Sequence, residues 1–162
     1  MHSWFVLAHV LGAFLFVLAH GVSMGAALKL HGERNRDRVM TLLEMSQGAI
    51  GIMYIGLVLL LAGGIAAGFS GSFWGRTWLW VALGTLVAVL IAMWSIATPH
   101  YMKLRGALAL PGPDGKLAET KGPPLGDAEI DALIDSPRPY LLALVGGLGL
   151  AIIVWLMVMK PF

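Results

Sequence analysis

The sequence predicts an all-α, polytopic membrane protein: an up-and-down bundle of four transmembrane helices with both termini outside. Of its 162 residues, 58% are hydrophobic and only 12% are charged, whereas a soluble domain carries about 25% charged residues. Four long stretches contain no Lys, Arg, Asp or Glu, and most of the charged residues lie to one side of them. The chain has no cysteine, which excludes a disulfide scaffold, a Cys-ligated zinc site and an iron–sulfur cluster.

The four uncharged stretches are long enough to cross a bilayer, whose core of about 30 Å requires ~20 apolar residues in a helix. They span about 4–28, 45–69, 78–97 and 141–159. The first stretch has no basic residue before it and is longer than the apolar part of a signal peptide, so we expect a retained helix. We expect all four helices to form a single domain, residues 1–162.

The basic residues predict the orientation. Nine of the 11 Lys and Arg residues lie between the first and second spans or in the segment 103–138 between the third and fourth. The positive-inside rule places both regions in the cytoplasm, at a bacterial inner membrane. The lipid bilayer is therefore the first expected partner, with anionic headgroups beside the basic residues. A net charge of +2 gives no reason to expect nucleic acid as a partner.

The connections between the spans also carry structural signals. The first cytoplasmic loop, 31–38, is short, and Asn35 or Asp37 can cap the start of the second helix. The segment 110–126 is rich in Pro and Gly, which predicts an irregular loop.

A short helix is predicted over 127–135, before Pro137 and Pro139. Three acidic residues share one face of it at spacings of four: Asp127, Asp131 and Asp135. We interpret this face as acidic and exposed to solvent. A divalent-cation site is the alternative, although no ligand-bearing loop accompanies the three carboxylates.

The histidines have an unusual distribution. Four of the five lie in or beside the first span, at spacings of 7, 11 and 11: His2, His9, His20 and His31. Steps of 7 and 11 residues return within roughly 20° of the same helix face. His9 and His20 fall inside the hydrocarbon, where a polar side chain is costly, so they should face the bundle interior.

Counting from the cytoplasmic ends of the spans predicts which residues share a depth. The residues level with His20 are Met53, Tyr54, Met93, Trp94, Gly146, Gly147 and Gly149. His9 is level with Gly63 and Gly64 of the second span. His100 is lower on the third span, near the cytoplasmic surface.

Two main interpretations of the buried histidines are open. In the first, His9 or His20 is an axial ligand of haem b, with Met53, Met93, His100 or no residue as the second ligand. Glycines on a facing helix would leave room for the macrocycle. The protein would then be a redox or electron-transfer module, with a quinone or another redox protein as its partner.

In the second interpretation, each histidine is neutral and hydrogen-bonds to a backbone carbonyl or a hydroxyl of a neighbouring helix. The protein would then be a non-catalytic scaffold or accessory subunit, forming a homo-oligomer or a larger complex through glycine faces such as Gly21-x-x-x-Gly25 and Gly64-x-x-x-Gly68. A proton or metal pathway along the histidines is a third possibility. Whether the protein is an enzyme stays open in all three.

Several segments resemble a known superfamily. The first span, HVLGAFLFVLAHGVSMGAALKLH, resembles the opening helix of the CopD/HemJ-like four-helix membrane proteins. The segments WLWVALGTL and IIVWLMVMKP are most similar to a branch known only as predicted integral membrane proteins. In the HemJ branch, the resemblance implies haem b and oxidation of protoporphyrinogen. His9 matches the opening histidine, whereas Trp80 and Ala82 replace the histidine and lysine of the third HemJ span.

Overall fold

The protein is all-helical over the residues that the computed structural model describes, which are 1–112, 114–117 and 125–162. The helices are α1 (His2–Leu30), α2 (Arg36–Ser70), the 3-10 turn η1 (Phe73–Gly75), α3 (Thr77–Ala107), α4 (Asp127–Ile134) and α5 (Arg138–Met159). Four helical segments are long and apolar enough to cross a membrane. The predicted all-α class is therefore confirmed.

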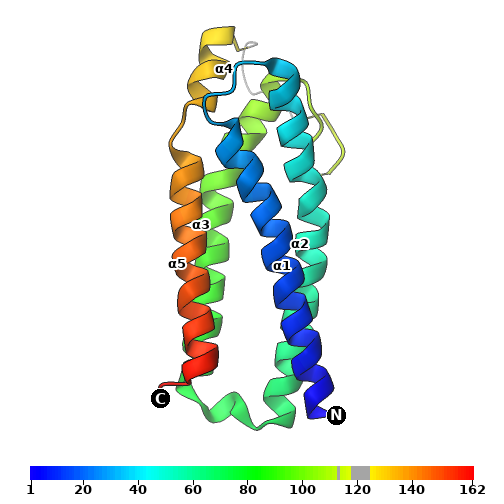
Figure 1. Cartoon of the computed structure of the whole chain (residues 1–162), viewed down its shortest axis with the longest axis vertical. Helices are drawn as coiled ribbons and strands as arrows, with labels where there is room; N and C mark the ends of the chain where they lie inside the picture. The colour runs from blue at the N-terminus through cyan, green and yellow to red at the C-terminus, as the bar shows by residue number, and fades with distance from the viewer. Residues whose placement is uncertain (113, 118–124) are drawn as a thin grey trace.

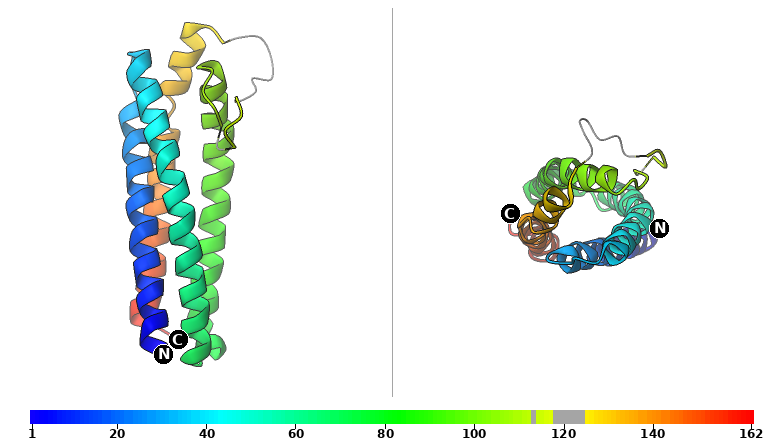
Figure 2. Two further views of the ribbon diagram at one scale, coloured as in Figure 1. Left: turned by 90° about the vertical axis from the view of Figure 1, so that its right-hand side faces the viewer. Right: turned by 90° about the horizontal axis from the view of Figure 1, so that it is seen from above.

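The long helices run up and down and form two antiparallel pairs (Figure 1). Helix α1 packs along α2, and α3 packs along α5, whereas the two pairs touch each other at far fewer points. Both termini lie at one end of the bundle and α4 at the other (Figures 1 and 2). We refer to these as the terminal end and the α4 end.

The helix boundaries differ from the prediction mainly at the α4 end. Helix α2 begins at Arg36, as the predicted cap at Asn35 implies, and so extends beyond the apolar span that begins at about 45; α3 continues through Pro99 to Ala107, beyond the span predicted to end near 97. The start of α2 is capped by Asn35, whose Oδ1 accepts a hydrogen bond from the Arg38 amide at 3.1 Å. The predicted short helix is present as α4. Within the predicted loop 110–126, residues 113 and 118–124 lie outside the described part of the chain.

Glycines bring the backbones of α1 and α2 into direct contact. A Cβ atom added to Gly56 would lie 2.6 Å from the Phe16 nitrogen, and one added to Gly63 would lie 2.5 Å from the His9 nitrogen. Gly12 faces the backbone of Leu60 in the same way. Such close approach maximises van der Waals contact, which is the main attraction between helices in lipid.

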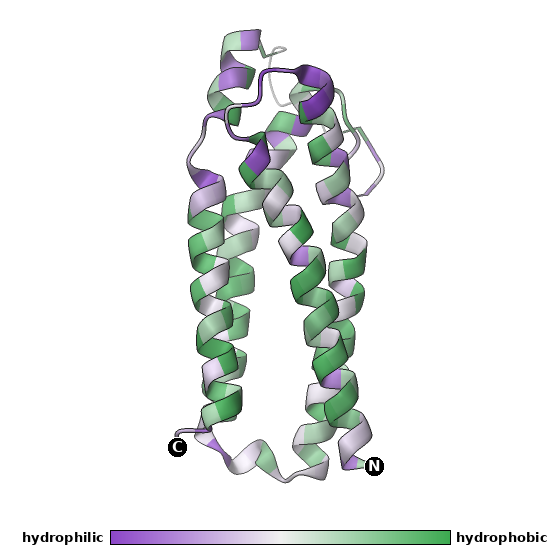
Figure 3. Ribbon diagram, viewed as in Figure 1, coloured by the Kyte–Doolittle hydropathy of each residue, from purple (hydrophilic) through white to green (hydrophobic). Residues whose placement is uncertain are grey.

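The largest apolar cluster lies at the α4 end, where α1, α2, α3 and α4 converge. Its buried members are Leu30, Val39, Leu43, Leu104, Leu110, Ile130 and Ile134. Figure 3 shows hydrophilic residues concentrated around this end, in contrast to the largely hydrophobic long helices. The cluster therefore joins the two helix pairs in the most polar part of the protein.

Candidate functional site

Three of the residues predicted to share a depth meet at one point between the helix pairs. A Cβ atom added to Gly146 of α5 would lie 3.2 Å from Nε2 of His20 and 3.2 Å from Sδ of Met93. His20 comes from α1 and Met93 from α3, so three helices contribute. The absence of a side chain at Gly146 is what allows the imidazole and the thioether to reach the same place.

The His20 ring is also held from its own helix. Phe16 lies one turn away, and its ring stacks on the imidazole with the planes at 3° and the centroids 6.1 Å apart. This stacking fixes the plane of the imidazole and leaves Nε2 directed at Gly146 and Met93.

The other residues predicted at this depth have different surroundings. The Trp94 side chain is 68% exposed, although it follows Met93 directly. Gly147 has no neighbouring atom within 4 Å of an added Cβ. Met53 is half-buried on α2.

His9 has a structural environment of the kind that the second interpretation describes. Its Nδ1–H donates a hydrogen bond of 2.8 Å to the carbonyl of Leu60 on α2. The ring also fills the space beside Gly64, where an added Cβ would lie 2.8 Å from Nδ1. His9 therefore ties α1 to α2 at the point where their backbones touch.

His100 lies far from His20, in the part of α3 next to the α4 end. Its side chain is only 3% exposed and packs edge-on to Tyr101, with the ring centroids 5.0 Å apart. Seven residues separate it from Met93, which is about 10 Å along a helix. The structure does not bring His100 together with the other candidate ligands.

A buried arginine is an important residue that the sequence analysis missed. Arg105 is 5% exposed; its Nη1 donates to the carbonyl of Leu43 at 3.0 Å and its Nε to the carbonyl of Pro111 at 2.6 Å. It thereby joins α3 to α2 and to the segment that follows α3. No sequence signal distinguishes it from the exposed Lys103 two residues earlier.

The acidic face of α4 is exposed to solvent and carries ion pairs to two arginines. Arg34 makes a bidentate contact with Asp135 at 2.7 and 3.1 Å, and Arg36 pairs with Asp131 at 2.8 Å. Arg36 also reaches Asp127 at 3.4 Å. The hydrogen bonds to Asp135 raise the pKa of the Arg34 guanidinium. The acidic face, exposed to solvent as predicted, therefore also docks α4 onto the α1–α2 loop and the first residue of α2.

No group of three or more His, Cys, Asp or Glu residues suited to a metal ion exists within the described residues. A haem iron is less demanding, because the porphyrin supplies four ligands and the protein needs to supply only one or two. Imidazole and thioether are one of the established axial pairs. The donor set of His20 and Met93, beside a position with no side chain, fits this group.

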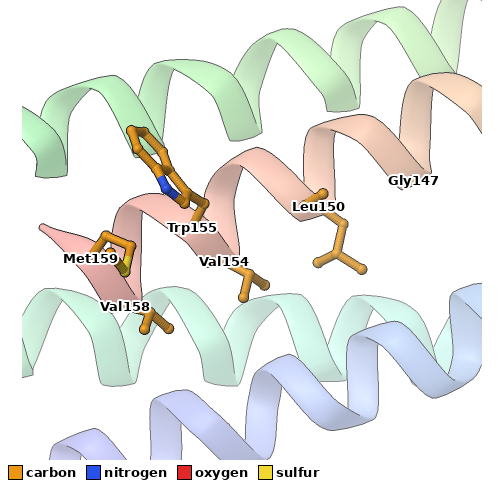
Figure 4. Close-up of a pocket in the computed structure, with 7 residues that line it drawn as sticks. Gly147, Leu150, Val154, Trp155, Val158 and Met159 are labelled. Carbon is orange, nitrogen blue, oxygen red and sulfur yellow. The ribbon is translucent and has the colours of Figure 1, made fainter. Parts of the chain in front are cut away.

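An apolar groove lies elsewhere, on the terminal half of α5 (Figure 4). It measures about 550 Å³ and is lined by Gly147, Leu150, Ala151, Val154, Trp155, Val158 and Met159. Gly149 and Leu156, which are buried, lie on the opposite face of α5. One helix supplies the whole lining, and no member is charged or carries an imidazole.

No family model, curated protein or solved structure matches the chain. The resemblance to the CopD/HemJ-like superfamily therefore stays a hypothesis. The fold and the site together define an all-helical protein with four helices of membrane-spanning length and a histidine–methionine pair in its interior.

Proposed function

We propose that the protein is an integral membrane redox module that binds haem b, whose iron His20 and Met93 would hold. The observation that carries this proposal is the meeting of His20 Nε2 and Met93 Sδ beside Gly146. These atoms come from different helix pairs, so a cofactor between them would be held by both. A CopD/HemJ-like ancestry would be consistent with this function.

The chain's own residues have distinct tasks in this proposal. His20 offers a neutral imidazole whose plane is set by Phe16, and Met93 offers a soft thioether that raises the reduction potential relative to a second imidazole. Gly146 keeps the space between them free of side-chain atoms. Haem b, when bound, supplies reversible one-electron chemistry.

The proposed setting is the bacterial inner membrane, with the α4 end in the cytoplasm and both termini outside. The concentration of Lys and Arg at the α4 end supports this orientation. The four membrane-length helices would expose the module to the bilayer, where a quinone is a suitable lipid-soluble partner, or to another membrane redox protein.

An absorption spectrum of the purified, detergent-solubilised protein tests this function. We expect a Soret band in the unmodified protein, its loss in His20→Ala, and a shifted spectrum in Met93→Leu. Met45→Leu is the matched control, because Met45 is an exposed methionine of α2, and it should leave the spectrum unchanged. A colourless unmodified protein, or full haem content in His20→Ala, would contradict the proposal.

A scaffold function is the second candidate, and an open glycine face favours it. Gly21 and Gly25 of α1 have nothing within 4 Å of an added Cβ, so another helix could approach closely there. This function predicts a homo-oligomer or larger complex that dissociates in Gly25→Leu. Gly75→Leu, in the η1 turn, is the control because Gly75 is also open but lies outside the long helices.

A further inference from the structure

Helices α1, α2 and α3 enclose a narrow cavity near the α4 end. Its volume, counted as the space that the centre of a water molecule can occupy, is about 10 Å³. The residues that line it are Ala26, Ala27, Leu30, Leu42, Leu43, Ser46 and Tyr101. That volume is close to the minimum that one water molecule requires. An apolar cavity of this size would stay empty, but this one has two hydroxyl-bearing residues in its lining.

Both hydroxyl groups have unused hydrogen-bonding capacity. The Tyr101 hydroxyl is buried and has no hydrogen-bond partner among the described residues. The Ser46 hydroxyl shares a hydrogen bond of 2.6 Å with the hydroxyl of Ser23. Since a serine hydroxyl provides one donor and two acceptor positions, Ser46 can bind a further group and keep its hydrogen bond to Ser23.

We propose that one water molecule occupies this cavity and bridges the hydroxyl groups of Tyr101 and Ser46. A buried polar group without a partner is unfavourable, and ordered water is the usual partner where no side chain is within reach. The bridge extends the Ser23–Ser46 hydrogen bond into a chain from α1 through α2 to α3. It thus supplies a polar link between helix pairs that otherwise make few contacts.

This water is enclosed on the side of the α4 end. Leu30 and Leu43 belong both to the cavity lining and to the apolar cluster that closes this end of the bundle. Its exchange with bulk water therefore depends on movement of that cluster. The site involves neither His20 nor Met93, so the inference is independent of the haem proposal.

Replacing Tyr101 by Phe tests the proposal, because the two possible states of the hydroxyl predict opposite changes in the thermal unfolding midpoint. If the hydroxyl is bonded to water, Tyr101→Phe lowers the thermal unfolding midpoint of the protein in bilayers. If the hydroxyl is unpaired, its removal relieves a burial cost and raises the midpoint. Tyr140→Phe, at an exposed tyrosine near the same end, is the matched control and should change nothing. An unchanged or raised midpoint for Tyr101→Phe would overturn the proposal.

Two further measurements address the bridge itself. In a double-mutant cycle, Tyr101→Phe and Ser46→Ala should be less destabilising together than the sum of the two separately, whereas Tyr101→Phe and Ser23→Ala should be closer to additive. Additivity of the first pair would argue against a shared water.

In the unmodified protein, water-edited solid-state NMR should show early polarisation transfer to the Tyr101 ring carbon that bears the hydroxyl. Absence of that transfer would overturn the site.

Discussion

His9 and His20 share one face of α1, yet their neighbours give them different roles. His9 donates to the Leu60 carbonyl at the contact between α1 and α2. His20 points between the helix pairs, where it meets Met93 beside Gly146. The difference arises from depth, because α2 covers the face of α1 closely at His9 while α3 and α5 approach it at His20.

We therefore predict that His9→Leu affects stability and leaves the content of the proposed haem unchanged. Loss of the hydrogen bond to Leu60 should cost about 0.6 kcal/mol, the average for such bonds in membranes. The free energy of unfolding in mixed micelles and the Soret absorbance per protein check the two parts. Loss of haem in this variant, with the fold intact, would move the ligand assignment from His20 to His9.

Arg105 carries a second prediction at the residue scale. Arg105→Met removes two hydrogen bonds from a buried cation to the carbonyls of Leu43 and Pro111. We expect a loss of about 1–3 kcal/mol in the free energy of unfolding. Lys103→Met is the control, because Lys103 is exposed on the same helix. Equal effects of the two substitutions would show that the buried hydrogen bonds of Arg105 contribute nothing to the free energy of unfolding.

The sequence could predict the depth of the site but not all of its members. Counting along the spans put seven residues level with His20, and three helices do meet there. Neighbouring residues on a helix differ by about 100° in direction, so Met93 faces the interior while Trp94 is exposed. Depth counting contains no information on this rotation, which depends on how the helices pack.

At the scale of the elements, the pair α1–α2 depends on glycines that allow contact between backbones. We predict that Gly63→Ala forces the two helices apart, because the new Cβ would lie 2.5 Å from the His9 nitrogen. Overpacking of this kind typically costs about 1–3 kcal/mol. Gly51→Ala on the same helix is the control, since nothing lies within 4 Å of its position. Unfolding midpoints of the two variants in bilayers provide the comparison.

The positions of the four long helices could be predicted because long stretches without charged residues are typical of membrane-spanning helices. The ends of the helices were harder to predict, since a hydropathy criterion stops at the first charged residues. Helix α2 starts with Arg36, Asp37 and Arg38, and only the Asn35 cap indicated that it begins there. The extension of α3 through Pro99 depends on the apolar cluster that covers its last turns, which is a tertiary effect.

At the scale of the whole molecule, the α4 end joins the helix pairs. Helix α4 leads into α5 and docks on the α1–α2 loop through Arg34 and Arg36. This contact joins residues about a hundred positions apart, for which no pattern in the sequence gives a signal.

We predict that the double substitution Arg34→Ala and Arg36→Ala releases α4 while the long helices stay folded. Ion pairs between exposed side chains contribute little to global stability, so the effect should be local. Hydrogen exchange of the α4 amides should become faster, and raised salt should have the same effect on the unmodified protein. Arg76→Ala, at the terminal end, is the control. Unchanged α4 exchange in the double variant would show that Ile130 and Ile134 hold α4 alone.

Helix α2 has 35 residues, which is about 52 Å at 1.5 Å per residue and well over a bilayer core of about 30 Å. In the proposed membrane setting, the surplus turns would carry Val39 and Leu43, so the cluster under α4 would lie outside the hydrocarbon, where burial from water favours folding in the usual way. Turns embedded in a bilayer would gain nothing from that force, because lipid tails are as apolar as their side chains. For the protein in bilayers we therefore expect urea to unfold the cluster under α4 first and to leave the long helices folded.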